Sequence, residues 1–272
     1  MGEAKRKQQT HAAMLEASPG CIYCAGANRA TTIEHMPPIQ LFEGRQRPKG
    51  LEFPASLSCN NQTGHADLVA SLLARSLPDA ATPTSRRDLV KVLSAVANNV
   101  HGLLEEMDIP RGAEKLARKH HGIPDDMHPL RADGPILSRH ILTFAAKLGF
   151  ALHFEMTNDF IPSAGGVQVM WFSNLQAMKG DIPQELFDML PGPKSLQQGR
   201  KGVGNQFKYS TAAGELGHML YFASFSTSFA VAGISALDRS VWLESYADKF
   251  PIYRPGDFAR DQSPALLQPR SI

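Results

Sequence analysis

Three cysteines near the start of the chain have a spacing that metal sites use. Cys21 and Cys24 are separated by two residues, so both sulfurs can reach one zinc ion at a tight turn. Cys59 is the one remaining cysteine and can supply a third sulfur. Because the number is odd and all three lie within residues 21–59, we expect a zinc knuckle in a reducing compartment rather than a disulfide framework.

The fourth position of an all-cysteine zinc site falls three residues before Cys59, where the chain has Ser56. Zinc in proteins prefers thiolate, imidazole and carboxylate ligands, so a serine hydroxyl is a poor replacement. Three alternatives stay open: three sulfurs with a water, three sulfurs with a nearby histidine, or a cluster that packs without zinc.

A carboxylate and an imidazole stand side by side at Glu34 and His35, and Pro37 and Pro38 stiffen the chain just beyond them. A histidine with an ordinary pKa can deprotonate water at cellular pH, and a carboxylate can hold a hard cation such as Mg²⁺. Neighbours on a strand point to opposite sides, so one side chain can face a metal while the other reaches the attacking water. An isolated pair of this kind is usually structural, but the flanking cysteines favour a chemical role.

Carboxamides follow Cys59 directly, at Asn60 and Asn61. The oxygen of Asn60 can complete the shell of a cation, although asparagine also caps helices well. His65 lies four residues after Asn61 and would share its face of a helix. It is a candidate second metal donor, substitute zinc ligand or phosphate contact, and an exposed surface position is the alternative.

Taken together, the CxxC pair, the Glu-His-x-Pro-Pro run and the Cys-Asn junction resemble the HNH endonucleases, also called ββα-metal nucleases. The resemblance covers about residues 18–75 and is nearest to a bacterial subgroup with a zinc knuckle and an EH-x-PP signature. It implies a β-hairpin and a helix that hold one divalent ion. By this resemblance His35 is the general base, Glu34 and Asn60 are metal ligands, and the structural zinc ligands are Cys21, Cys24 and Cys59. The chain departs from the family at Ser56, and no middle asparagine that orients the base is evident between residues 39 and 55.

Basic residues between the two motifs are candidates for nucleic-acid binding. Arg45, Arg47 and Lys49 lie in what we expect to be a flexible loop that contacts phosphates, although such charges are often only solvated. The glycine-rich run from Gly199 to Gly204 lacks the ending of a nucleotide-binding loop, so we interpret it as a β-turn.

Length and composition set the outer limits. The chain has 272 residues, 43% of them hydrophobic, and a net charge of +2, so a sizeable core is available and any nucleic-acid surface must be a local basic patch. No run of about 18 apolar residues is present, and the charged start has no apolar segment after it. We therefore expect no membrane span, no secretory signal and a cytoplasmic protein.

Periodicity predicts helices first and strands later. Helices are expected over residues 1–17, 66–77, 85–103, 112–121 and 136–155, with Ser85 capping the third of them. Strands are expected at 167–172, at 206–210 and within 219–235, followed by a loosely ordered tail after residue 251. The predicted fold is α+β: an HNH-like module over residues 1–80, a linker at 77–85, and a region over 81–272 that packs helices on a mostly antiparallel sheet and serves substrate recognition or regulation.

The predicted function is that of a metal-dependent endonuclease that hydrolyses phosphodiester bonds in nucleic acid, DNA rather than RNA. His35 would activate water beside Mg²⁺, or Mn²⁺ or Ni²⁺ in its place. One alternative is a degenerate zinc-knuckle module that binds nucleic acid or protein without cleavage. Another is a hydrolase of a different small phosphodiester, with its pocket in the C-terminal region.

Overall fold

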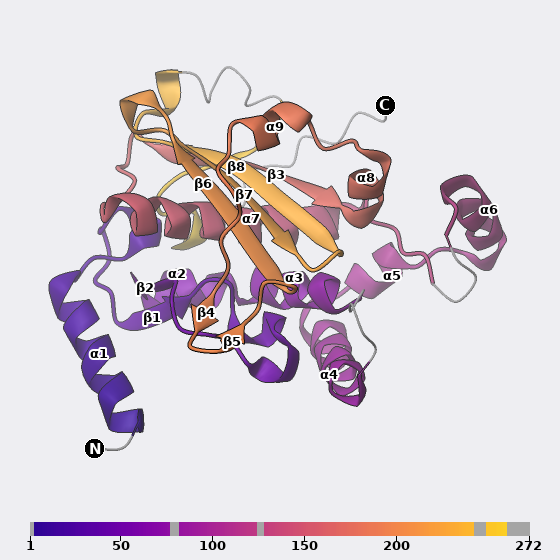
Figure 1. Ribbon diagram of the computed structural model, residues 1–272, viewed down its shortest axis with the longest axis horizontal. Coiled ribbons are helices and arrows are strands. Elements are labelled where there is room, and N and C mark those ends of the chain that lie inside the picture. The colour runs from indigo at the N-terminus through magenta and orange to yellow at the C-terminus, as the bar shows by residue number, and fades with distance from the viewer. Residues whose placement is uncertain (1–2, 77–81, 124–127, 242–248, 260–272) are drawn as a thin grey trace.

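The protein is described by a computed structural model that covers residues 3–76, 82–123, 128–241 and 249–259 (Figure 1). A five-stranded antiparallel sheet packs against helices, and a separate two-stranded pairing lies near the N-terminus. This mixed, largely antiparallel arrangement confirms the predicted α+β class.

The N-terminal part contains a long helix, a pair of short strands and two more helices. Helix α1 (Glu3–Ala17) precedes strand β1 (Thr32–His35), and three 3₁₀ turns occupy Ile22–Cys24, Ile39–Leu41 and Glu43–Arg45. Strand β2 (Glu52–Ala55) runs antiparallel to β1, with His35 opposite Glu52 and Thr32 opposite Ala55. The chain then enters α2 (Leu57–Gln62) and α3 (Gly64–Ser76), which gives the order strand, strand, helix.

The middle of the chain is helical, but the helix predicted over residues 85–103 ends at Asn99, and a separate short helix that was not predicted begins at Leu103. The helices are α4 (Pro83–Asn99), α5 (Leu103–Met107), α6 (Arg111–His121) and α7 (Pro135–Thr157). Helix α4 begins before the predicted cap: the Thr82 hydroxyl accepts the backbone N–H of Ser85, so the assignment of Ser85 as the cap was wrong. Helix α7 is buried along most of its length because apolar side chains occur all round it.

The large sheet has the order β6-β7-β8-β3-β9. Its members are β3 (Gly166–Ser173), β6 (Phe207–Ala213), β7 (Met219–Phe225), β8 (Phe229–Ala236) and β9 (Ile252–Tyr253). Strand β7 alternates buried and half-buried residues, as expected for a strand whose inner face packs on a helix layer. Figure 1 shows α7 across one face of this sheet, with α8 (Asn174–Lys179) and α9 (Gln184–Asp188) on the other side.

Two smaller expectations have definite outcomes. The run from Gly199 to Gly204 does form a turn, between β4 (Gln197–Gln198) and β5 (Lys201–Gly202). The expectation of a loose tail was wrong for residues 252–259, because β9 pairs with β3 and both Tyr253 and Phe258 are buried. Residues 260–272 and most of the predicted linker, 77–81, lie outside the described residues.

Aromatic contacts join the two predicted parts through α7. The Phe53 ring of β2 meets Phe154 edge-on at 6.1 Å, and the Tyr23 ring meets Phe150 at 6.3 Å. Buried residues before and after residue 80 therefore belong to one hydrophobic core. The division at residue 80 stays a prediction, but the two sides are in close contact. Across the described residues, no helix combines the length and apolar character needed to cross a membrane.

Candidate functional site

The cysteine pair lies on a tight turn that the backbone stabilises. Ala25 and Gly26 follow Cys24 with φ of 52° and 75°, in the left-handed region where a chain reverses sharply. The N–H of Gly26 donates to the Cys21 carbonyl at 3.0 Å, and the N–H of Asn28 donates to the Cys24 sulfur at 3.2 Å. The neighbouring Cys21 and burial nevertheless raise the pKa of the Cys24 thiol overall, although this N–H and the Cys59 thiol favour the thiolate that binds metal.

Cys59 completes the cluster from α2. All three cysteines are buried and free of disulfides, and their sulfur atoms lie within 4.8 Å of one another. Tetrahedral zinc with bonds of about 2.3 Å would hold its sulfurs about 3.8 Å apart, so a small adjustment suffices. The thiols of Cys24 and Cys59 lower the pKa of Cys21 by hydrogen bonding to its sulfur. Three buried cysteines in this arrangement can hold a metal ion such as zinc.

Ser56 lies beside this cluster but also serves the helix. It is the cap of α2, and its oxygen accepts the N–H of Cys59 at 3.3 Å. Its N–H and hydroxyl also help to lower the pKa of the Cys21 thiol. The residue at the expected fourth-ligand position is therefore within reach of the sulfurs while it holds the helix start in place.

Glu34 faces the interior instead of the solvent. Its carboxylate lies 3.2 Å from Nζ of Lys147, a residue of α7, and the same ammonium lies 2.7 Å from the carboxylate of Asp67. The exposed fractions are 4% for Glu34, 6% for Asp67 and 0% for Lys147. The structure thus gives Glu34 a buried ion-pair partner, a role that the sequence had not indicated.

The two acids and the lysine form an ion triad with unusual electrostatics. Burial raises the pKa of Asp67 to about 6, although Lys147 opposes this, and Glu34 adds to it. Burial tends to lower the pKa of Lys147, but attraction to Asp67 and Glu34 outweighs it and the net shift is upward. The second oxygen of Asp67 and the hydroxyl of the neighbouring Tyr23 have no hydrogen-bond partner among the described residues. Removal of one member of the triad should therefore lower the free energy of unfolding, because a remaining charge would be buried without its counter-charge.

The raised pKa of Asp67 gives a pH-dependent prediction. Between its usual value of 3.8 and about 6, the folded protein keeps a proton on Asp67 that the unfolded chain has released. The free energy of unfolding of the wild type, minus that of Asp67→Asn, should therefore fall as pH rises through this window and level off above about pH 7. Urea unfolding of both proteins at fixed ionic strength measures this difference. A difference that grows with pH over the same window would contradict it.

His35 points to the other side of β1, as strand alternation requires. Its Nε2 lies 3.7 Å from one carboxylate oxygen of Glu52, the cross-strand partner, and Nε2 of His11 lies 3.6 Å from the other oxygen. The donor atoms of the three residues all lie within 4.8 Å of one another. Nε2 of His11 is buried with no hydrogen-bond partner among the described residues, so it is available to a ligand. This second cluster, which we call the His–His–Glu cluster, is a candidate metal site.

The His–His–Glu cluster opens into a pocket of about 270 Å³. Besides the cluster, its wall includes the cationic residues Arg47, Lys49 and Lys201 and the amide of Gln198. A divalent ion held at the cluster would therefore face a cavity with a basic rim. Such a cavity suits an anionic substrate.

The sequence did not single out His11 and Glu52. Glu52 could have been found from the strand register, because a hairpin places it opposite His35. His11 offers no local signal, since α1 reaches the hairpin only through tertiary packing.

Glu34 and His65 lie outside both candidate metal clusters of the described residues. Among the described histidine, cysteine and acidic residues, the clusters of three able to hold a metal are the cysteines and the His–His–Glu cluster, and neither contains Glu34 or His65. His65 is exposed and lies near His140, with 6.3 Å between ring centroids. Asn60 is half-buried and lies in α2, the helix that follows Ala55 at the end of β2. Ala55 pairs with Thr32, at the opposite end of β1 from His35, so α2 begins about 10 Å from His35 along this strand.

The loop after Pro38 is held in place rather than free. The Arg47 guanidinium donates to five backbone carbonyls, those of Met36, Pro37, Pro48, Gly50 and Leu51. Burial lowers its pKa to about 10, which still leaves it charged at neutral pH. Arg47 thus braces the pocket wall with most of its donors, whereas Arg45 and Lys49 are exposed.

Two candidate metal centres of different character thus flank the β1–β2 hairpin: a buried cluster of sulfurs and an open cluster of two imidazoles and a carboxylate. The resemblance to HNH endonucleases rests on the motifs within residues 18–75. Comparison of the chain with protein-family models, with curated proteins and with solved structures finds no match.

Proposed function

We propose that this protein is a metal-dependent phosphodiesterase that cleaves nucleic acid, with its reactive metal at the His–His–Glu cluster. The observation that carries the proposal is the convergence of His11, His35 and Glu52 at a pocket whose rim is basic. A metal beside cationic side chains is what phosphodiester hydrolysis needs, because negative charge builds up on the phosphate in the transition state.

The donor set bears on which metal binds. Two imidazoles and one carboxylate suit zinc, nickel, cobalt or manganese, whereas Mg²⁺ prefers an all-oxygen shell and binds imidazole poorly. The proposal therefore replaces the expected Mg²⁺ with a transition metal, and Mn²⁺ and Ni²⁺ remain candidates.

The residues around the pocket have distinct roles in this proposal. A bound divalent ion supplies charge neutralisation for the phosphate and a water acidic enough to attack near neutral pH. His11 and His35 hold the ion, so His35 acts as a ligand here rather than as the general base. Glu52 has two carboxylate oxygens, one for the ion and one to accept a proton from the attacking water. Lys49 neutralises the phosphate, and Arg47 keeps the loop in position.

We also propose that the cysteine cluster holds structural zinc. Three buried free thiols at this spacing fit a zinc site in a reducing compartment, which agrees with the expected cytoplasmic location. Zinc there would tie the Cys21 turn to the start of α2 and so fix the end of the β1–β2 hairpin.

The zinc proposal makes a prediction about metal content. Cys21→Ser should lower bound zinc from roughly one ion per chain to near zero, because two sulfurs alone hold zinc weakly. Ser56→Cys should slow zinc loss to a chelator, about tenfold or more, because it completes four sulfurs. Elemental analysis and chelator competition measure both changes. Ser94→Cys is the matched control, since Ser94 is exposed on α4. Equal zinc retention in the Ser56 and Ser94 variants would contradict the knuckle assignment.

A substrate and metal panel tests the catalytic proposal. Purified protein is incubated with supercoiled plasmid, single-stranded RNA and bis(p-nitrophenyl) phosphate, each with Mg²⁺, Mn²⁺, Co²⁺, Ni²⁺ or Zn²⁺. Cleavage that depends on a transition metal supports the proposal, and faster cleavage of plasmid than RNA supports DNA as the substrate. Nucleic-acid binding that no metal converts into cleavage would instead favour the degenerate binding module, an alternative that Ser56 at the fourth-ligand position supports. Cleavage of the small diester alone would favour a hydrolase of a different phosphodiester.

A further inference from the structure

A short hairpin from the C-terminal region reaches the pocket at His35. Strands β4 and β5 and the turn between them form this hairpin, Gln197–Gly202, and all of its residues are exposed. Gly199 adopts φ of 59°, which allows the tight reversal, with Arg200 in the turn and Lys201 at the start of β5. Figure 1 shows β4 and β5 below the large sheet, beside the loop that follows β1.

Specific contacts attach the hairpin to the site. The side-chain oxygen of Gln198 accepts the backbone N–H of Lys49 at 3.3 Å. Gly50 has little room beside the hairpin, because a Cβ there would lie 3.3 Å from the Leu196 side chain. Gln198 and Lys201 line the same pocket as His35 and Glu52. The hairpin therefore forms part of the wall around the candidate metal.

The chemistry of the hairpin indicates what it can bind. Arg200 and Lys201 add to exposed Lys49, and Glu52 is the acidic residue of the pocket lining. The hairpin has no aromatic side chain on which a base could stack. Cations without stacking surfaces contact phosphates and carry no direct information about base sequence.

We propose that the β4–β5 hairpin is a clamp that binds the phosphate backbone of nucleic acid next to the bond to be cleaved. This inference rests on the proposed phosphodiesterase activity and gives the C-terminal region a role in substrate binding. Lys201, which lines the pocket, contacts a phosphate near the reacting one, and Arg200 contacts the next along the strand. The clamp is independent of sequence and sensitive to salt.

The double variant Arg200→Gln/Lys201→Gln tests the clamp. Binding of a labelled duplex and a labelled single strand is measured by fluorescence anisotropy in EDTA over a series of salt concentrations. The variant should bind both about tenfold more weakly near 0.1 M salt. The slope of log affinity against log salt should fall by about two, one for each lost phosphate contact. Hydrolysis of bis(p-nitrophenyl) phosphate should fall less than cleavage of the duplex does, because this small ester can meet Lys201 at the pocket but does not extend to Arg200.

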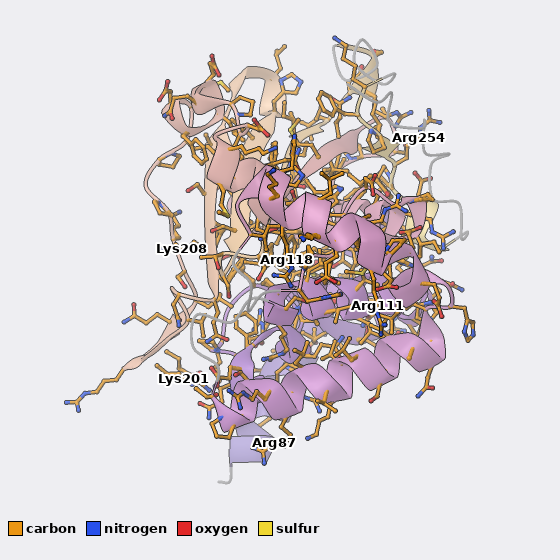
Figure 2. The ribbon with its side chains drawn as sticks, turned by 90° about the vertical axis from the view of Figure 1, so that its right-hand side faces the viewer. Arg87, Arg111, Arg118, Lys201, Lys208 and Arg254 are labelled. Carbon is orange, nitrogen blue, oxygen red and sulfur yellow. The ribbon has the colours of Figure 1, made fainter. Side chains whose placement is uncertain are left out.

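The matched control is Arg111→Gln/Lys115→Gln on α6, which removes the same two charge types from exposed positions. Lys201 and Arg111 lie in different parts of the molecule (Figure 2), so the control should leave affinity and salt slope as in the wild type. Thermal unfolding of each variant shows that the fold is retained.

Each further result has a definite meaning. Equal affinity and slope in the hairpin variant and the wild type overturn the clamp, as does equal weakening in the α6 control. A fall in small-ester hydrolysis as large as the fall in duplex cleavage also overturns it, because the hairpin would then act only at the metal pocket. If the hairpin variant weakens binding as expected but the wild type cleaves no substrate with any metal, the clamp stands and the proposed catalytic function fails.

Discussion

Replacement of His35 by alanine is expected to lower metal-dependent cleavage at least about a hundredfold, because even the loss of an outer contact to a metal ligand can cost this much. His11→Ala and Glu52→Gln should have effects of similar size, since each removes one donor from the same cluster. Metal affinity, measured by titration calorimetry with Mn²⁺ or Ni²⁺, should fall in parallel. Activity is measured as the initial rate of cleavage of plasmid or of the small diester, at a metal concentration that saturates the wild-type protein.

Two further variants show whether a loss of activity is specific to the His–His–Glu cluster. His101→Ala is the matched control, because His101 is exposed at the turn between α4 and α5 and should leave cleavage unchanged. Asn60→Ala separates the structure from the motif: the resemblance makes Asn60 a metal ligand, whereas the His–His–Glu cluster does not include it. A large loss in Asn60→Ala, with full activity in His11→Ala, would return the metal to the position that the motif implied.

The largest expected effect on stability is that of Lys147→Met. The side chains are similar in length, but methionine leaves the carboxylates of Glu34 and Asp67 buried without their counter-charge. Breaking a buried ion pair in this way costs about 3–5 kcal/mol of unfolding free energy. Urea unfolding of the wild type and the variant at neutral pH measures the cost.

Two comparisons show whether the cost comes from the triad. Lys208→Met changes the same residue type at an exposed position of β6 and should cost less than about 1 kcal/mol. The triple variant Lys147→Met/Glu34→Gln/Asp67→Asn should regain part of the lost stability, because no unpaired charge then remains in the core. A single Lys147→Met variant as stable as the wild type would refute the role of the triad.

The triad also connects the two predicted parts of the chain. Lys147 belongs to α7 and lies 113 positions from Glu34 in sequence, yet its ammonium contacts the strand that carries His35. A helix outside the resemblance therefore helps to hold β1, the strand that carries His35. Residues 18–75 alone do not account for the packing of this strand.

Local patterns were a sound guide to the elements and to the sulfurs. The helices at α3, α4 and α7 follow from apolar spacing, and the CxxC pair follows from the reach of two sulfurs across one turn, because both signals lie within a few residues. Chain ends were less predictable: a strand formed at Ile252–Tyr253 because β3 offered a free edge for pairing. The sequence of the tail alone does not indicate that it pairs with β3.

The sequence by itself determined the α+β class, the approximate position of the longer helices and a set of cysteines that can hold a metal. Only the tertiary structure decided that Glu34 pairs with Lys147 and that His35 meets His11 and Glu52. The physical reason is that strand alternation sends neighbouring side chains to opposite faces, while the long-range packing of α7 and α1 decides what each face meets.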